Sequence, residues 1–198
     1  MRRREVLAAV GVASIGGLAG CGGTAPTTGG GDSKGEEDDE GESDADAGTD
    51  NDTGTSDLPT NWPSGTYADY DATTVTVRTP EGDDLGAVLA AIARTGNEWG
   101  LGLSDAPTLP ENAGMLFVFP EPRDSLTFIM PNMDFGIDIV YADAEGTIVE
   151  IHNAPEPGPN EDGSDQEYPG SGQYVLEVPY KWTERQGVDV GDSLAFEL

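Results

Sequence analysis

Short runs of β-branched and aromatic residues recur along this chain from residue 73 to its C-terminus, with turn residues between them. Taken in order, these runs occupy residues 73–78, 115–119, 126–130, 137–141, 147–152, 174–178 and 193–196. Runs of this length, bounded by Gly, Pro and Asp, are typical of short β-strands. The pattern predicts one mostly β domain over residues 66–198, and about 130 residues are enough to bury a sizeable core.

Three segments do not follow this strand pattern directly. In the alanine-rich run at 85–92, apolar residues recur at helical spacing, but the run also follows a strand and a turn, which equally suits the second strand of a hairpin. Residues 183–186 predict a short helix. Residues 153–172 hold four prolines and four glycines, which predicts a long loop. Long loops in compact domains are more often functional than structural.

The N-terminus has the features of an export signal. Residues 1–20 begin with three arginines and continue through an apolar run of about 14 residues, which is shorter than the ~20 that a membrane-spanning helix needs. Arg3 and Arg4 resemble a twin-arginine signal, the export route for folded proteins. The sequence Leu-Ala-Gly-Cys that ends at Cys21 resembles a lipobox. We therefore expect Cys21 to be lipidated and to hold the protein on the extracytoplasmic face of the cell membrane.

The cysteine count limits the alternatives. Cys21 is the only cysteine, which excludes a disulfide scaffold and a cysteine-based zinc site. Two acyl chains, each contributing ~0.8 kcal/mol per buried CH₂, would hold the protein on a membrane where a single chain would not. The alternative interpretation of residues 1–21 is an uncleaved signal anchor in which the cysteine has no special role.

The net charge of the chain limits the classes of partner that we expect. The chain has 38 acidic and 9 basic residues and a formal net charge of −29. Such a chain repels phosphate backbones, so no nucleic-acid partner is expected. Negative charge also destabilises a compact state by self-repulsion unless salt screens it, and at molar salt the Debye length falls to about 3 Å. We interpret the charge as adaptation to high salt, in preference to an acidic-substrate trap.

The segment between the signal and the domain has almost no apolar residues. Residues 21–65 consist largely of Gly, Thr, Ser, Asp and Glu, and such a composition predicts a disordered, acidic tether. Its self-repulsion would extend it into a spacer between membrane and domain. Asn51 begins an Asn-Asp-Thr sequon, which makes it a candidate glycosylation site.

Polar residues within the apolar runs are the candidates for a site. Asp138 interrupts the apolar run 137–140, and it lies either on a solvated face or in a pocket, as a base or a ligand-anchoring acceptor. His152 is the only histidine, which rules out a multi-histidine metal site; it is either a general base or a half-buried residue bonded to loop carbonyls. The segment 130–138 and the loop 153–172 would form the pocket. Its candidate residues are Met130, Asn132, Asp138 and His152.

No metal or cofactor motif accompanies these residues. The acidic clusters at 143–146 and 160–165 do not match the twelve-residue calcium loop. The glycines are not followed by the lysine of a phosphate-binding loop, and no nucleophile elbow is present. We therefore predict no cofactor and no metal, and the sequence assigns no catalytic residue.

Five ordered blocks in the domain resemble a known family. They are 114–119, 128–132 followed by Ile137 and Asp138, 143–149, 175–177 and 187–192. In this order they resemble domain-of-unknown-function family 192 over residues 73–198, and the acidic, lipidated form resembles members from salt-loving archaea. The resemblance implies a compact β-barrel-like or sandwich domain with short helices, a strand at 87–94 and a helical turn near 97–103. We therefore predict a strand at 87–94, although apolar residues recur at helical spacing in the run 85–92.

The chain departs from the family pattern at one block. Where the family typically has Phe-Trp-Met-Lys-Asn, Ile129 stands for the tryptophan and Pro131 for the lysine. Any role of that lysine is therefore missing here, and the family has no established activity to carry over.

These observations favour one functional hypothesis and leave two others open. The favoured hypothesis is a membrane-anchored, monomeric, non-catalytic module that binds a small ligand or an envelope component. The alternative is a hydrolase that uses Asp138 and His152. A third possibility is a structural or partner-binding lipoprotein without a pocket.

Overall fold

A computed structural model of the chain describes residues 57–198. Cys21, Arg3, Arg4, Asn51 and most of the predicted tether lie outside the described residues. The described part contains seven strands, two short α-helices and one 3-10 turn at Gly65–Tyr67. Their bounds are β1 (Ala72–Arg78), β2 (Asp84–Ala93), α1 (Gly96–Leu101), β3 (Ala113–Ile129), β4 (Ile137–Ala142), β5 (Ile148–Ala154), β6 (Glu167–Pro179), α2 (Trp182–Gln186) and β7 (Ser193–Ala195).

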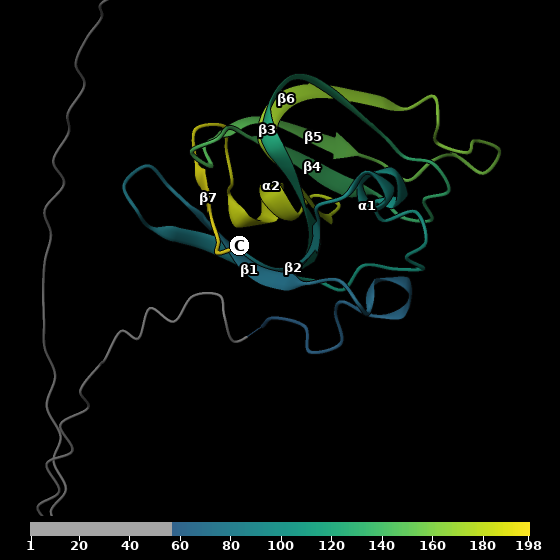
Figure 1. The fold of residues 1–198 in the computed structure, drawn as a ribbon, viewed down its shortest axis with the longest axis horizontal. Coiled ribbons are helices and arrows are strands. Elements are labelled where there is room, and N and C mark those ends of the chain that lie inside the picture. The colour runs from purple at the N-terminus through teal and green to yellow at the C-terminus, as the bar shows by residue number, and fades with distance from the viewer. Residues whose placement is uncertain (1–56) are drawn as a thin grey trace, which may run out of the picture. The chain divides into compact units, whose positions relative to one another are not determined.

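All seven strands form one curled sheet in the order β5-β4-β6-β3-β2-β1-β7. Every pair is antiparallel except β2 and β3, which are parallel and joined by a crossover that contains α1. The sheet curls around α2 (Figure 1). Its two ends approach each other at an isolated bridge between Thr147 and Ser193, where the Ile148 N–H donates to the Asp192 carbonyl at 2.8 Å. The predicted mostly β, barrel-like architecture is confirmed as a curled half-barrel.

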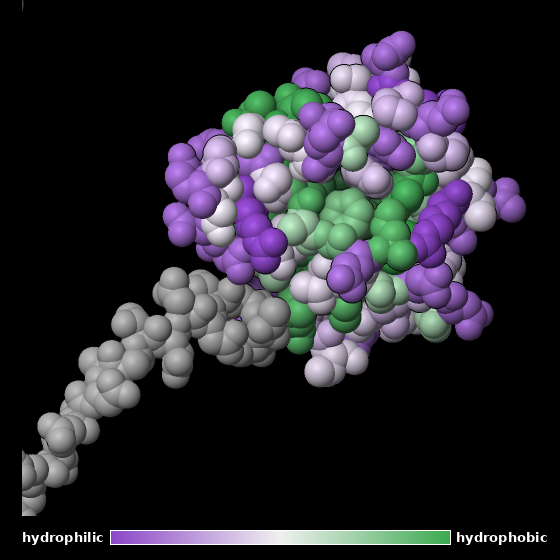
Figure 2. All heavy atoms as spheres, turned by 60° about the vertical axis from the view of Figure 1, so that its left-hand side comes forward, coloured by the Kyte–Doolittle hydropathy of each residue, from purple (hydrophilic) through white to green (hydrophobic). Residues whose placement is uncertain are grey.

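Apolar side chains fill both faces of the sheet. On the face covered by α2, called the α2 face, Trp182 packs with residues of every strand, among them Val75, Val88 and Leu176. On the opposite face, called the α1 face, the cluster includes Trp62 and Phe117. Trp62 is buried, so the folded part begins upstream of residue 66. Figure 2 shows one side of the domain, where apolar side chains lie in a hollow inside a rim of polar ones.

Burial on both faces explains the helical spacing at 85–92. That segment is strand β2, as the family resemblance implied. Val88 and Ala90 point to the α2 face, while Leu89 and Ala91 belong to the α1 face. A strand that is buried on both faces has a nearly continuous run of apolar residues. Such a run is compatible both with the 3.6-residue period of a helix and with the two-residue period of a strand. The predicted helices near 97–103 and 183–186 are also present, as α1 and α2.

Two predictions about strand limits are wrong. The runs 115–119 and 126–130 belong to one long strand, β3, whose pairing with β6 shifts register at Arg123. The predicted loop 153–172 is shorter, because β5 continues to Ala154 and β6 begins at Glu167. The glycines near the start of β6 allow it to cross β4 closely: a Cβ on Gly170 would lie 2.7 Å from the Tyr141 ring. Close backbone approach is a common reason for glycine within a strand.

The described helices are short. No helix within residues 57–198 is long and apolar enough to cross a membrane.

Candidate functional site

The α1 face contains a pocket of about 290 Å³. α1 and the turn after it form one wall, and the second half of β3 with the turn at 130–133 forms the other. β4 and β6 contribute one residue each from the sheet below. The lining residues are Trp99, Gly100, Leu101, Gly102, Leu103, Ser104, Phe117, Phe119, Leu126, Thr127, Phe128, Ile129, Met130, Pro131, Met133, Ile137 and Glu177.

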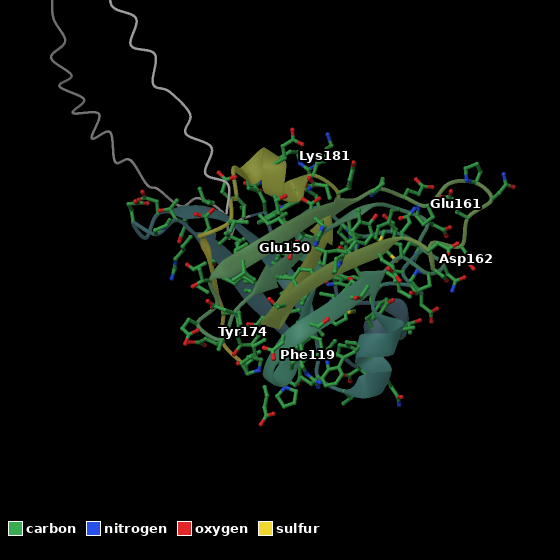
Figure 3. All side chains as sticks on the ribbon, turned by 90° about the horizontal axis from the view of Figure 1, so that it is seen from above. Phe119, Glu150, Glu161, Asp162, Tyr174 and Lys181 are labelled. Carbon is green, nitrogen blue, oxygen red and sulfur yellow. The ribbon has the colours of Figure 1, made fainter. Side chains whose placement is uncertain are left out.

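A capping box positions the α1 wall. The Thr95 side chain accepts from the Glu98 N–H at 3.4 Å, and the Glu98 carboxylate accepts from the Thr95 N–H at 2.8 Å. This reciprocal pair satisfies free N–H groups at the start of the helix and fixes its first turn. Trp99 then packs against Phe119 with ring centroids 4.9 Å apart, and its Nε1 donates to the Ala93 carbonyl. Figure 3 shows Phe119 on β3, next to α1.

Aromatic packing positions the opposite wall. Phe128 meets Phe117 edge to face at 4.8 Å and Tyr141 at 5.8 Å. The Tyr141 hydroxyl donates to the Tyr168 carbonyl at 2.6 Å, which ties β4 to the first part of β6. Edge-to-face pairs of this kind contribute about 0.5–1.5 kcal/mol each beyond the area they bury. The second half of β3 therefore stays paired with the first part of β6, and its Phe128 side chain lines the pocket.

Glu177 is the only ionisable residue among those that line the pocket. In β6 it pairs with Met115 of β3 on one side and Ile139 of β4 on the other, so its neighbours across the strands are apolar. The residue is 4% exposed, and its Oε2 has no hydrogen-bond partner among the described residues. Burial raises the pKa of Glu177 to about 8. At neutral pH the floor of the pocket is therefore a protonated carboxylic acid.

Two buried tyrosines are the titratable groups electrostatically coupled to Glu177. Burial raises the pKa of Tyr67 to about 12 and also raises that of Tyr141, with smaller contributions from the charge of Glu177. The Tyr67 hydroxyl accepts from the Asp105 N–H at 3.2 Å. Both tyrosines are neutral over the pH range in which Glu177 titrates, and a phenol can only lose its proton to become negative, so neither supplies a cation to pair with the carboxylate.

Asp138 lies on the other side of the sheet. It faces the α2 face and is fully buried, and its carboxylate accepts four hydrogen bonds. The donors are the Asn153 amide, the N–H groups of Lys181 and Thr183, and the Thr183 hydroxyl, at 2.7–2.9 Å. Asp138 thus caps the start of α2 in place of a residue from the helix itself, because Lys181 at the N-cap makes no side-chain cap.

His152 packs between aromatic rings and contacts a backbone carbonyl. It pairs with Ile139 across β4 and β5, on the α1 face, and its ring lies between those of Tyr141 and Tyr168. Its Nε2 lies 2.7 Å from the Pro169 carbonyl and 3.3 Å from the Glu150 carboxylate. The alternative of a half-buried histidine bonded to a backbone carbonyl therefore describes this residue.

The four predicted pocket residues do not converge. Met130 is buried and lines the pocket, whereas Asn132 is an exposed turn residue with φ 55°. Asp138 and His152 lie on opposite faces of the sheet, because adjacent residues Asn153 and His152 pair with Asp138 and Ile139. This geometry does not support a hydrolase built on Asp138 and His152, because one residue cannot act on a substrate held by the other.

The loop between β5 and β6 does contact the predicted segment. The Met130 N–H donates to the Gly163 carbonyl at 3.1 Å, and the Asn132 N–H to the Asp162 carbonyl at 2.9 Å. A Cβ on Gly163 would collide with the Met130 carbonyl, so glycine is required there. Figure 3 shows Glu161 and Asp162 at the tip of this loop, which projects from one end of the domain. Within residues 57–198, no three His, Cys, Asp or Glu side chains are placed to hold a metal ion.

A family model matches residues 77–196 of the chain, more than half of its length. The chain belongs to the DUF192 family. This family is described as "Uncharacterized ACR", so membership establishes the domain and not an activity. Several of the sequence blocks that carry the resemblance build the pocket, through Phe117, Phe119, Phe128, Met130 and Glu177.

Two solved structures are similar to this DUF192 domain. The first is a proposed transcription regulator from Sinorhizobium meliloti 1021, with 26% identity, a TM-score of 0.58, and coverage of 64% of this chain and 95% of that one. The second is a protein of unknown function from Novosphingobium aromaticivorans DSM 12444, with 26% identity, a TM-score of 0.53, and coverage of 63% and 84%. No curated protein matches the chain.

The sequence contained a signal for Glu177 that the predicted pocket did not use. Glu177 interrupts the apolar run 174–178 just as Asp138 interrupts the run 137–140. The two signals are equivalent in sequence, because each shows a carboxylate in a strand that is buried on both faces. Only the contacts distinguish them: Asp138 has four donors, and the Glu177 Oε2 has none.

Proposed function

We propose that this protein is a lipid-anchored, non-catalytic binding module that presents an apolar pocket outside the cell membrane. The observation that carries the proposal is the pocket itself, with an unpartnered, buried acid on its floor. Protein interiors are normally packed with few voids larger than a water molecule. An open cavity and an unsatisfied buried polar group each lower stability. Their occurrence at the same place is best explained by a ligand that occupies the cavity and pairs with the buried acid.

The dimensions and lining of the pocket define the ligand. A volume of about 290 Å³ corresponds to roughly ten water volumes of ~30 Å³, so we expect a molecule of roughly ten heavy atoms. The walls are aromatic and aliphatic. Apart from Trp99, whose Nε1 already donates to the Ala93 carbonyl, only Ser104, Thr127 and Glu177 offer side-chain nitrogen or oxygen atoms. These residues do not form a nucleophile with an oriented base, which favours binding over catalysis.

Filling the pocket should abolish binding. Ser104 is half-buried and lines the pocket, so we expect Ser104→Phe to occupy part of its volume. The affinity for octan-1-ol, an apolar probe of suitable size, should fall by at least about tenfold. Isothermal titration calorimetry on the full, unlipidated chain measures this affinity. Trp99 lines the pocket, and its emission gives a second readout.

A second serine provides the matched control. Ser125 is exposed on β3 and does not line the pocket, so Ser125→Phe adds the same atoms elsewhere and should leave octan-1-ol affinity unchanged. Equal weakening by both substitutions would contradict the proposed pocket function.

The anchor is tested separately. Lipidation of Cys21 is supported by its position after Leu-Ala-Gly and by its being the only cysteine. Cys21→Ala should move the protein from the membrane pellet to the soluble fraction, because the acyl chains hold it there through burial of ~0.8 kcal/mol per CH₂. Ser14→Ala, within the apolar run but away from the cut site, should leave the protein in the pellet. Membrane retention of Cys21→Ala would contradict the anchor.

A further inference from the structure

We propose that the pocket selects a cationic amphiphile, a primary ammonium head on an apolar body, and that the head pairs with the Glu177 carboxylate. This inference rests on the proposed binding function and adds the chemical class of the ligand. It follows from three features of the site, which are the geometry of Glu177, the charge of the chain and the groups that surround the acid.

The first feature is the unpartnered carboxyl group. A ligand that fills the pocket lies between aromatic and aliphatic walls. The only ionisable side chain that it contacts is that of Glu177. An ammonium brings three donors and a full positive charge to an oxygen that has no partner. Charge-assisted hydrogen bonds of this kind are about twice as strong as neutral ones. An alcohol would supply a single neutral hydrogen bond in the same place.

The second feature is the charge of the chain. With 38 acidic residues against 9 basic ones, the chain attracts cations and repels anions over long range. An anionic amphiphile would have to approach this surface and then place its own charge beside Glu177, where two like charges would share a buried site. Salt screens the surface attraction, but it screens a buried pair much less. The preference for a cation should therefore persist at molar salt.

The third feature is what faces Glu177 from the neighbouring elements. Met115 of β3 and Ile139 of β4 flank it in the sheet. Tyr67 from the N-terminal segment and Tyr141 from β4 are the titratable groups coupled to it, and both stay neutral. Among the described residues of these elements, none is a cation that faces Glu177 and could pair with its carboxylate. An incoming ammonium would therefore be paired with a proton leaving Glu177 to solvent.

The test compares three probes of one chain length that differ in head-group charge: octylamine, octan-1-ol and octanoate. Each is titrated calorimetrically into the full, unlipidated chain at molar salt. An alkylamine resembles the lysine side chain, with a pKa of about 10.4, so at about pH 9 the amine is charged and Glu177 is ionised. There we expect octylamine to bind at least about tenfold more tightly than octan-1-ol, and octanoate to bind more weakly than both.

The protonation state of Glu177 should affect octylamine affinity, whereas purely hydrophobic binding would not depend on pH in this range. Below the Glu177 pKa of about 8, octylamine affinity should weaken by up to about tenfold per pH unit. At pH near 7, binding should release close to one proton, seen as a dependence of the measured heat on the ionisation enthalpy of the buffer. Octan-1-ol should release none.

Glu177→Gln is the decisive variant, and Glu167→Gln is its control on an exposed position of the same strand. In Glu177→Gln the octylamine advantage over octan-1-ol, its pH dependence and its proton release should all disappear, because the amide cannot ionise, and urea unfolding of the variant shows that it is folded. Glu167→Gln should behave as wild type.

The outcomes separate the two proposals. Octan-1-ol binding as tight as octylamine at about pH 9, or octanoate binding best, would overturn the cationic ligand and leave the pocket function standing. Failure of all three probes to bind would overturn the pocket function itself.

Discussion

Asp138→Ala is expected to lower the free energy of unfolding by about 3–4 kcal/mol. The substitution removes the side chain that caps α2. It leaves the N–H groups of Lys181 and Thr183, the Thr183 hydroxyl and the Asn153 amide without the acceptor that they share. Each buried donor left unsatisfied costs about 1–3 kcal/mol before water enters the space. Urea unfolding, followed by tryptophan emission, measures the loss.

The backbone around Lys181 increases the dependence on Asp138. Lys181 has φ 60°, a left-handed conformation that is unfavourable for a residue with a Cβ. The Lys181 N–H donates to the Asp138 carboxylate at 2.8 Å, which helps to hold this conformation. Trp182, the next residue, is fully buried in the α2-face cluster. Losing the cap therefore also loosens a large core side chain.

Two variants define the specificity of this effect. Asp138→Asn keeps the shape and one acceptor oxygen, so we expect a loss between those of wild type and Asp138→Ala. Asp134 is exposed and four residues earlier, and Asp134→Ala should change stability by no more than about 0.5 kcal/mol. If Asp138→Ala unfolds at the same urea concentration as Asp134→Ala, Asp138 is not the cap of α2.

The fold could be predicted from the sequence where local pattern and burial agree. The runs that became β1, β4 and β5 are short, apolar and bounded by turn residues, and the sequence placed their cores correctly. The sequence divided β3 into two runs because Pro120 and Pro122 interrupt it. In the folded chain the strand continues through a register shift, and both prolines lie between Val118 and Arg123, where β3 has no paired residue in β6 and no N–H is needed. Where this gap falls depends on a partner strand about 50 residues away, which local sequence does not contain.

The site was less predictable for a related reason. The sequence offered Asp138, which interrupts an apolar run, and His152, the only histidine, as residues that could act together, and they lie in the paired strands β4 and β5. Whether two residues in neighbouring strands share a face depends on the pairing register, and a shift of one residue reverses it. The register here pairs Asp138 with Asn153 and leaves His152 on the opposite face. The pocket also depends on how α1 and the second half of β3 lie relative to each other, which is a tertiary feature.

Glu177 should make the stability of the domain fall as the pH rises, and this is the second large effect that we expect. The pKa of Glu177 is raised from 4.5 to about 8 by burial. Between these two values the folded state holds a proton that the unfolded chain has released, so raising the pH favours unfolding. The contribution of Glu177 is fully present below about pH 4.5 and is lost by about pH 8. The slope is about 1.4 kcal/mol per pH unit, which amounts to several kcal/mol over the whole window.

Comparison with Glu177→Gln isolates this contribution from every other group that titrates in the same window. The amide is close in size and cannot ionise, so the variant should be more stable than wild type by several kcal/mol above pH 8 and should show no such difference near pH 4.5. Urea unfolding of both chains across this range, at constant salt, gives the difference directly. Parallel curves for the two chains would mean that Glu177 ionises in the folded state as readily as in the unfolded one. A buried acid that resists ionisation would instead give a stability difference that grows with pH, because ionising the buried carboxyl group costs free energy that a cationic ligand would offset.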